Sequence, residues 1–349
     1  MIDNKRNLLG LAWPALTDFF LELGEPEFRA RQLMEWVYGR GVSDWSEMTN
    51  FSKALRQRLA ERAVIGAGRV IARQTAKDGT SKLAIAWPDG AIAECVILRY
   101  HYGATLCLSS QVGCKMGCAF CASGMSGFSR HLTAQEMIEQ IWWANQELAP
   151  VHERIGHLVY MGMGEPLDNL EEVLSSIRLA NNPLGWNIGM RNITVSTSGL
   201  VPGIDRLAEE KLQLTLSISL HAPVDYLRNQ IMPVNRRYPV RELMAAAERY
   251  VAATNRKLTF EYILLAGFND QVIHAQQLAE LLGRLLCNVN LIPYNSVPDL
   301  PWSSPDQQTV QRFADVLTKR GVAVTVRREL GPDIEAACGQ LRRRLQGEE

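Results

Sequence analysis

Two spacings of hydrophobic and polar residues divide the chain. In the first 60 residues, apolar positions recur every three or four residues, as in EFRARQLMEWVYGRG (27–41) and SKALRQRLAERAV (52–64), which predicts amphipathic helices. Between about 68 and 100, RVIARQTAKDGTSKLAIAW and AIAECVILRY, separated by the turn residues PDG, predict strands. The pattern therefore indicates a small N-terminal α+β accessory domain ahead of the main domain.

From residue 104 onward, strand-like segments alternate with helical ones. Such βα units predict a parallel sheet in an open, partial (β/α)6 TIM-like barrel. The predicted strands are 104–110, 156–162, 192–198, 214–221, 258–265 and 288–294, with a further one in 322–330. The predicted helices are 133–148, 170–182, 241–254, 273–286 and 306–321, the first of them with Thr133 as its N-cap and Glu136 completing a capping box.

These patterns predict three segments. A helical accessory domain covers 1–60, a β-rich connecting segment that carries Glu94 covers 61–100, and the barrel domain with its C-terminal strand covers 101–349. Active sites on such barrels lie at the C-terminal ends of the strands, so the loops that follow the strands are where function is expected.

Composition narrows the class of protein. Of the 349 residues, 37 are basic and 37 acidic, so nucleic acid could bind only at a local basic face. No signal peptide and no membrane-spanning run is predicted. The seven cysteines are an odd number in a long chain, which does not indicate a disulfide framework. They favour a reducing, cytoplasmic location with cysteines kept for metal binding or catalysis.

Three of these cysteines lie close together in GCKMGCAFC (113–121), just past the first barrel strand. Cys114, Cys118 and Cys121 have the spacing C-x3-C-x2-C, and thiolates in such a loop bind zinc or an iron–sulfur cluster. Zinc usually takes four protein ligands from paired knuckles, and the sequence has no second knuckle. A [4Fe–4S] cluster held by three cysteines leaves one iron open. Phe120, next to the third cysteine, is suited to shield such a cluster from water.

Other polar residues follow the later strands. Gly164 and Glu165 belong to GMGEP after the second strand, Ser196 ends the third, Ser219, Leu220 and His221 end the fourth, and Asn295 follows the sixth. Each has an ordinary reading, since serine and asparagine often cap helices and Glu–Pro is a common turn. Their position at the ends of consecutive strands favours one shared site.

The cysteine spacing, with an aromatic residue before the last cysteine, resembles the radical S-adenosylmethionine (SAM) signature. The resemblance implies a [4Fe–4S] cluster on Cys114, Cys118 and Cys121, whose fourth iron is chelated by SAM. It also implies that electron transfer cleaves SAM to a 5′-deoxyadenosyl radical, with the protein supplying orientation and exclusion of water. The strand-end set from Gly164 to Asn295 matches the SAM-binding positions of that superfamily.

A wider set of motifs is similar to the RlmN/Cfr family of adenine methyltransferases. These are CLSSQVGCKMGCAFCASG, GMGEPLDN, VSTSG, SLHAP, MPVN, AGFND, LIPYN and DIEAACGQL, which span about residues 94–341. The resemblance implies that Cys338 is methylated by one SAM and carries the methyl group, and that a second SAM activates it to form a covalent protein–RNA adduct. It implies that Cys107 resolves this adduct through a disulfide with Cys338, and that Glu94 is the proton acceptor. Cys95 and Cys287 match no role and are expected to be structural.

The resemblance implies an adenosine of 23S rRNA as the substrate, and tRNA as a second one. The base must be unpaired or flipped out, because an adenine within a duplex cannot reach such a site. The basic runs FRAR, RNQIMPVNRRYPVR, TVRR and LRRRL are candidate phosphate contacts, although each also suits a solvated surface. Residues 1–60 are a candidate RNA contact. The resemblance also implies an electron donor such as flavodoxin and a disulfide reductant, and we expect a monomer.

Within the family, RlmN methylates carbon 2 of adenine and Cfr methylates carbon 8. GMGEPL and the segment ASGMSGFSRHLTAQEM after the third cysteine look more like RlmN, so we expect methylation at carbon 2. The cysteine positions do not discriminate, because both types use the same set. Two alternatives remain from other classes of protein: a radical SAM-like protein that only binds RNA, and a zinc-binding structural RNA protein.

Overall fold

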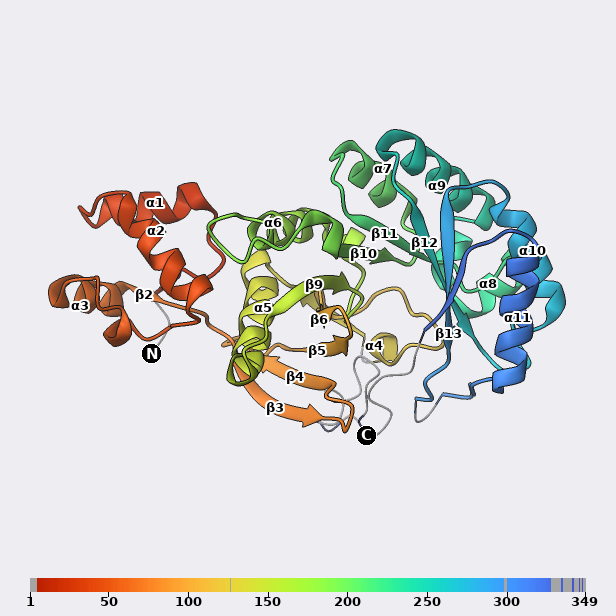
Figure 1. Ribbon diagram of the computed structural model, residues 1–349, viewed down its shortest axis with the longest axis horizontal. Helices are drawn as coiled ribbons and strands as arrows, with labels where there is room; N and C mark the ends of the chain where they lie inside the picture. Colours follow the sequence, from red (N-terminus) through yellow and green to blue (C-terminus); the bar gives the residue numbers. More distant parts are fainter. Residues whose placement is uncertain are drawn as a thin grey trace.

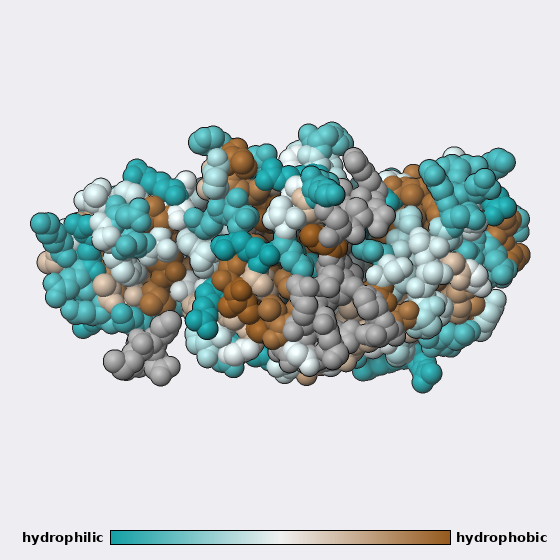
Figure 2. Space-filling view, turned by 90° about the horizontal axis from the view of Figure 1, so that it is seen from below, coloured by the Kyte–Doolittle hydropathy of each residue, from teal (hydrophilic) through white to brown (hydrophobic). Residues whose placement is uncertain are grey.

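The computed structural model describes residues 5–125, 127–297 and 300–327, together with 334, 341, 345 and 347. The molecule is elongated, with the N-terminal helices at one end and the helices α7–α11 at the other (Figure 1). No helix within the described ranges has both the length and the apolar character needed to cross a bilayer. On the face shown in Figure 2, hydrophilic side chains cover much of both ends and hydrophobic ones gather in patches, the broadest near the middle.

Residues 5–65 form the helical end of the molecule, as the apolar spacing predicts. Leu16, Phe19 and Phe20 lie on the buried side of the first helix and pack with Phe51 in the core of this end. Two short parallel strands bring its beginning and its end together. The elements are β1 (Arg6–Asn7), α1 (Trp13–Glu22), α2 (Phe28–Met34), α3 (Lys53–Arg62) and β2 (Ala63–Val64), with a π-helical turn over Glu35–Gly39 and a 3-10 turn over Trp45–Glu47.

One ten-stranded sheet runs through the rest of the molecule. Its order is β3-β4-β5-β6-β9-β10-β11-β12-β13-β14, antiparallel from β3 to β6 and parallel from β6 to β14. The strand predictions for this region are confirmed, and the parallel part is the partial barrel. The strands are β3 (Arg69–Thr75), β4 (Ser81–Ala86), β5 (Ile92–Tyr100), β6 (Gly103–Cys107), β9 (Ile155–Tyr160), β10 (Ile193–Thr197), β11 (Thr215–Ser219), β12 (Leu258–Leu264), β13 (Cys287–Pro293) and β14 (Val324–Val326).

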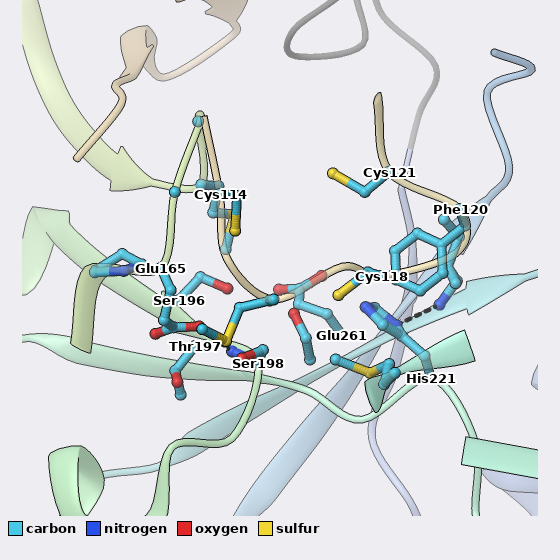
Figure 3. Close-up of a pocket in the computed structure, with 18 of the residues that line it drawn as sticks. Cys114, Cys118, Phe120, Cys121, Glu165, Ser196, Thr197, Ser198, His221 and Glu261 are labelled. Atoms are coloured by element: carbon cyan, nitrogen blue, oxygen red, sulfur yellow. Dashed lines mark hydrogen bonds between the residues drawn. The ribbon is translucent and has the colours of Figure 1, made fainter. Parts of the chain in front are cut away.

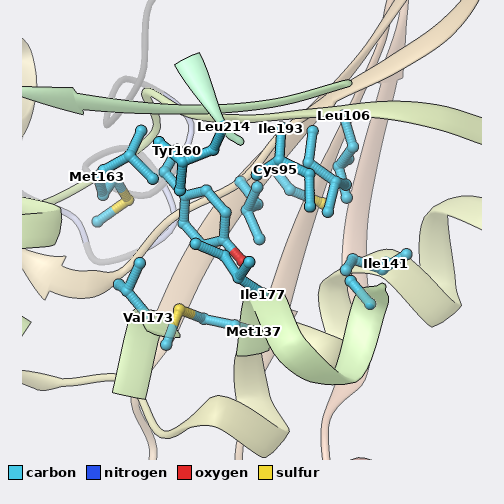
Figure 4. Close-up of a cluster of buried hydrophobic side chains, with 14 of the residues drawn as sticks. Cys95, Leu106, Met137, Ile141, Tyr160, Met163, Val173, Ile177, Ile193 and Leu214 are labelled. Carbon is cyan, nitrogen blue, oxygen red and sulfur yellow. The ribbon is translucent and has the colours of Figure 1, made fainter. Parts of the chain in front are cut away.

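Helices cover the outer face of the barrel, and the main core lies between them and the sheet. Figure 4 shows Cys95, Leu106 and Tyr160 from the strands packed against Met137 and Ile141 of α5. The predicted capping box of Thr133 and Glu136 is present at the start of α5. The helices are α5 (Ala134–Leu148), α6 (Leu170–Ala180), α7 (Val201–Glu209), α8 (Asp225–Ile231), α9 (Val240–Thr254), α10 (Val272–Leu282) and α11 (Gln307–Lys319), with 3-10 turns over Ala149–Val151, Pro166–Asn169, Met190–Asn192 and Pro233–Arg236.

A small ribbon that the sequence pattern did not predict frames the cysteine loop. The strand β7 (Gln111–Gly113) pairs with β8 (Phe128–His131) in an antiparallel ladder, and the short helix α4 (Ala122–Met125) lies between them in sequence. Three-residue strands carry too few positions for an alternating pattern to show. The ribbon closes the cysteine loop at its base, where the Cys114 N–H donates a hydrogen bond to the Gly127 carbonyl (3.0 Å).

Glu139 of α5 joins the N-terminal end to the barrel. Its buried carboxylate accepts hydrogen bonds from the side-chain amide of Asn7 (2.7 Å), the backbone N–H groups of Ala67 and Gly68 (both 2.7 Å) and the indole N–H of Trp87 (2.8 Å). A buried carboxylate is tolerated when several donors surround it, because they replace the water that it has lost. The connection between the helical end and the sheet is therefore a fixed junction.

Candidate active site

The cysteine loop lies over the C-terminal ends of the parallel strands, as the sequence predicts. Cys114, Cys118 and Cys121 line a cavity of about 230 Å³, and Figure 3 shows their sulfur atoms facing a common space. Later parts of the chain hold the loop: the Ala119 N–H donates to the Ile231 carbonyl (2.9 Å), and the Trp302 indole N–H donates to the Ala119 carbonyl (2.9 Å). The loop is thus fixed at its middle as well as at its base.

The three thiols are suited to a positively charged metal group. Burial raises the pKa of Cys114 to about 12 and that of Cys118 well above its ordinary value, and the neighbouring thiols add repulsion. Such thiols ionise when a cation compensates them. A structural zinc usually takes four protein ligands, whereas in an iron–sulfur cluster each cysteine binds a different iron. Three cysteines on one loop therefore fit a cluster better than a single zinc.

Gly164 and Glu165 follow β9 and form one wall of the cavity. Gly164 has a φ of 105°, and a Cβ there would lie 2.5 Å from the Cβ of Gln111, so the close approach of the two chains requires glycine. The buried Glu165 carboxylate accepts hydrogen bonds from the backbone N–H groups of Leu167 (3.0 Å) and Ser198 (2.6 Å). Burial raises its pKa and these hydrogen bonds oppose the rise. A fixed carboxylate of this kind is suited to an ammonium group.

Three further predicted residues line the same cavity. Ser196 and Ser219 lie at the ends of β10 and β11, and His221 follows with a left-handed φ of 58°. The His221 ring packs edge-on against Phe120 (4.8 Å between centroids), and its Nδ1 accepts a hydrogen bond from the Ile263 N–H (3.0 Å), so Nε2 carries the proton of the neutral ring. Burial lowers the His221 pKa to about 3, which keeps the ring neutral near pH 7.

Other predicted site residues lie away from the described cavity wall. Leu220 is fully buried in the hydrophobic core, so only its backbone is near the strand ends. Asn295 is half-buried after β13 and is not among the described lining residues. Glu94 and Cys107 lie on β5 and β6 and are not among the described lining residues, although Cys107 belongs to a small apolar cluster that packs against Met161 of the cavity wall. Cys338 lies outside the described residues.

One part of the predicted phosphate-binding surface is wrong. Arg228, in the basic run 228–241, is fully buried and donates hydrogen bonds to the carbonyl groups of Leu220 (3.0 Å), Ser198 (2.6 Å) and Ser219 (3.1 Å). Desolvation lowers its pKa to about 10, so it remains a cation. The guanidinium therefore holds together the loops that follow β10 and β11 and is not available to a phosphate. A charge run in sequence does not distinguish a surface arginine from one buried under loops.

The sequence pattern missed several residues of the cavity. Glu261 of β12 points into it from below in Figure 3, with its carboxylate accepting hydrogen bonds from the Ser217 hydroxyl (2.6 Å) and the Asn290 amide (2.7 Å). Burial raises the Glu261 pKa, opposed by these two donors and by Arg327. A signal was present, because Glu261 interrupts an apolar strand at the position where its neighbours in sequence, Phe260 and Tyr262, face the core.

The face of β5 that carries Glu94 leads toward this cavity. Val96 of β5 pairs with Cys107 of β6, and Cys107 pairs with Val159 of β9, so their side chains share one face of the sheet with Glu94. The Ser109 hydroxyl donates to the Glu94 carbonyl (2.6 Å) and accepts from the Met163 N–H (2.8 Å). The strand of Glu94 is thus tied to GMGEP (162–166), which contributes to the cavity wall.

The cysteine loop above a partial barrel, with the Gly–Glu wall beside it, is the site of a radical SAM protein. The family model described as Radical SAM superfamily matches residues 108–279, and the one described as Ribosomal RNA large subunit methyltransferase N-terminal domain matches residues 6–65. The chain belongs to the RlmN family of radical SAM RNA methyltransferases. Membership implies a [4Fe–4S] cluster and SAM, and the arrangement of the three cysteines fits that cluster.

Relatives extend this likeness over nearly the whole chain. A probable dual-specificity RNA methyltransferase RlmN of Symbiobacterium thermophilum is 48% identical over 98% of this chain and 92% of its own length. The protein of the same description from Desulforamulus reducens is 46% identical over 99% of this chain and 98% of its own. A crystal structure of a radical SAM methyltransferase from Sphaerobacter thermophilus has a TM-score of 0.93 and 44% identity, covering 96% of this chain and 98% of that one.

Proposed function

We propose that this protein methylates carbon 2 of an adenosine in 23S rRNA, and of an adenosine in tRNA. The observation that carries the proposal is the cavity in which the cysteine loop, Gly164 and Glu165 meet beside the face of Glu94 and Cys107, in a chain with the N-terminal domain of the RlmN family. Dual specificity is what the names of its relatives state of them. An adenine must be unpaired to enter a cavity of about 230 Å³.

Each residue near the cavity then has a task. Cys114, Cys118 and Cys121 hold the cluster, and Glu165, Ser196, Ser219 and His221 orient SAM, with the backbone of Leu220 and the side chain of Asn295 at its edge. When bound, the cluster and SAM supply radical cleavage of an unreactive C–H bond. The chain's own groups exclude water from this chemistry, since Phe120 covers the loop on one side. Two molecules of SAM are used in each turnover, with one cluster per chain.

Cys338 carries the methyl group between the two half-reactions. It would first be converted to S-methylcysteine. Its methyl carbon would then lose a hydrogen atom to the radical that bound SAM supplies and bond to the adenine, giving a covalent protein–RNA adduct. Glu94 accepts the proton that leaves the adenine carbon. Cys107 would attack the Cys338 sulfur, which breaks the bond between that sulfur and the methylene carbon and leaves a disulfide between the two cysteines. The released carbon takes up a proton and becomes the methyl group of the RNA. An electron donor such as flavodoxin and a dithiol reductant restore the enzyme, which acts as a monomer in the cytoplasm.

Mass spectrometry of digested RNA after reaction tests this function. We expect 2-methyladenosine from both rRNA and tRNA. The variant Cys338→Ala should transfer no methyl group, and Cys107→Ala should accumulate the crosslinked protein–RNA adduct, because the sulfur of Cys338 is no longer attacked. Cys287→Ala, a change of a half-buried cysteine on β13, is the matched control and should leave product formation unchanged. A yield of 8-methyladenosine, or methylation by Cys338→Ala, would contradict the proposal.

A further inference from the structure

Lys82 and Glu94 form a fully buried ion pair on the strands next to the barrel. Lys82 Nζ lies 3.2 Å from Glu94 Oε2, and both side chains are 0% exposed. A lysine is almost never fully buried unless it is paired, because its ammonium group loses its hydration. Even when paired, such charges contribute little net stability compared with apolar residues of similar size. Stability of the fold therefore does not by itself account for this pair.

Two other buried charged groups of the described chain have evident structural tasks. Glu139 joins the N-terminal end to the sheet, and Arg228 holds the loops after β10 and β11. The pair of Lys82 and Glu94 lies within regular strands, where the backbone groups are already bonded through the ladder between β4 and β5. Unlike Glu139 and Arg228, the pair lies on the face of the sheet that leads to the cavity.

The register of the strands defines the surroundings of the pair. Lys82 pairs with Val96, and Val96 pairs with Cys107, so the lysine and the resolving cysteine flank β5 in one row across the sheet. Glu94 lies two residues along β5 on the same side. Adjacent strands lie about 5 Å apart, so Glu94 is a near diagonal neighbour of both. The titratable groups on the described strands of this face include Tyr100 on β5, Cys107 on β6 and His157 on β9, besides Lys82 on β4. Arg327, just after β14, lies close to Tyr100.

We propose that Lys82 is a positioning residue for methyl transfer, which holds Glu94 as a carboxylate oriented to accept the proton of the adenine carbon. This inference rests on the proposed function. A carboxylate that has lost all its water takes up a proton unless a cation or several donors compensate its charge. The ammonium group of Lys82 supplies that compensation and fixes the direction of the carboxylate.

The step that Lys82 supports transfers one proton and no electron. The C–H bond of the adduct breaks, its electron pair remains in the adenine ring, and the proton bonds to an oxygen of Glu94. Lys82 stays an ammonium ion throughout and then stabilises the carboxylate again once the proton has left. Without Lys82, the buried carboxylate of Glu94 would lose the cation that compensates its charge and fixes its direction.

The experiment compares Lys82→Met and Lys82→Arg with the wild type, as cluster-loaded enzymes acting on an RNA that contains the target adenosine. We expect Lys82→Met to lower the rate of product release about tenfold or more at neutral pH, since a change of one pH unit in the ionisation of the base corresponds to about tenfold. The covalent adduct should accumulate. The pH at which Lys82→Met reaches half of its maximal rate should be higher than in the wild type. Lys82→Arg, which keeps the positive charge, should have the same dependence of rate on pH as the wild type.

A double variant separates this role from a structural one. If Lys82 acts through Glu94, adding Lys82→Met to Glu94→Gln should slow the reaction no further than Glu94→Gln alone. Because both charges are then absent, this double variant also avoids an unpaired buried charge. Arg249→Met, which breaks the exposed ion pair of Arg249 with Asp205, is the matched control and should change neither rate nor pH profile.

The outcomes distinguish the two proposals. A wild-type enzyme that methylates no RNA contradicts the proposed function itself. If the wild type is active and the Glu94→Gln variant is fully active as well, Glu94 is not the proton acceptor. Lys82 then has no carboxylate to position. Equal pH profiles and adduct levels in wild type and Lys82→Met overturn the inference. Additive losses in the double variant overturn it as well, and that comparison applies even when Lys82→Met alone is poorly folded.

Discussion

At the scale of single residues, glycine 164 shows how the backbone makes room for the site. Its φ of 105° and the 2.5 Å that would separate an added Cβ from Gln111 act together. The positive φ disfavours any side chain at this position, and the short distance means that Gln111 would have to move to make room for one. Gln111 in turn accepts a hydrogen bond from the Glu165 N–H (2.9 Å), so a shift there would displace the carboxylate beside the cysteine loop.

We predict that Gly164→Ala lowers the free energy of unfolding by about 2–4 kcal/mol and weakens SAM binding at least about tenfold. Gly90→Ala is the matched control, because Gly90 has a similar φ of 85° but no atoms within 4 Å of the added Cβ. It should lose only about 1–2 kcal/mol from backbone strain. Denaturant unfolding and SAM titration provide the measurements, and equal losses in the two variants would contradict the argument about close approach.

At the scale of elements, the strand ends are held in place by groups that come from elsewhere in the chain. Arg228 of α8 donates to carbonyl groups in the loops after β10 and β11, and to the side chain of Asn235 (2.8 Å). Asn269 similarly donates to the His221 carbonyl (2.8 Å). Buried polar side chains thus hold in place the loops that carry the proposed SAM-binding residues.

We predict that Arg228→Met destabilises the protein by about 3 kcal/mol or more, because it leaves several buried carbonyl groups without a donor. The same variant should bind SAM more weakly, since the loops after β10 and β11 lose their common support. Arg320→Met, which removes an exposed ion pair with Glu280 on α10, should cost less than about 1 kcal/mol. Thermal unfolding of both variants measures the difference, and similar melting temperatures would refute the prediction.

The elements that the sequence predicts are those with a long periodic pattern. The parallel strands and α5 carry enough apolar positions to be recognised, and the cysteine spacing alone locates the loop. The helix α7 was missed because its start, Val-Pro-Gly, looks like a turn, although proline suits the first turn of a helix. The partners of Arg228 and of Lys82 could not be predicted, because which buried groups meet depends on strand register and on contacts between distant segments.

At the scale of the whole molecule, Glu139 connects the N-terminal end to the barrel. One apolar core extends from the region around Phe20 in the N-terminal end to the space between the sheet and the barrel helices. Between them, the four hydrogen bonds to Glu139 come from Asn7, from the segment 67–68 and from Trp87. Gln135 and Gln146 of the same helix also donate to carbonyl groups of the N-terminal end, so α5 forms the junction and Glu139 is its buried charged group.

We predict that Glu139→Gln lowers the free energy of unfolding by about 2–4 kcal/mol, because an amide NH₂ cannot accept the hydrogen bonds that one carboxylate oxygen accepts. Protease cleavage should become faster near residues 65–68. Glu147→Gln on the same helix, which affects a partly exposed ion pair with Arg73, is the control and should change stability by less than about 1 kcal/mol. Unchanged cleavage in Glu139→Gln would show that the junction does not depend on this carboxylate.

The order of the ten strands has a consequence for how the protein is made. From β3 to β14 each strand of the large sheet lies beside the one that precedes it in that sheet along the chain. During synthesis, a newly emerged strand therefore finds its pairing edge already present, on the strand of this sheet that was made just before it. The sheet can grow in the direction of translation, and the strands that carry Lys82, Glu94 and Cys107 are in place before most of the barrel has left the ribosome.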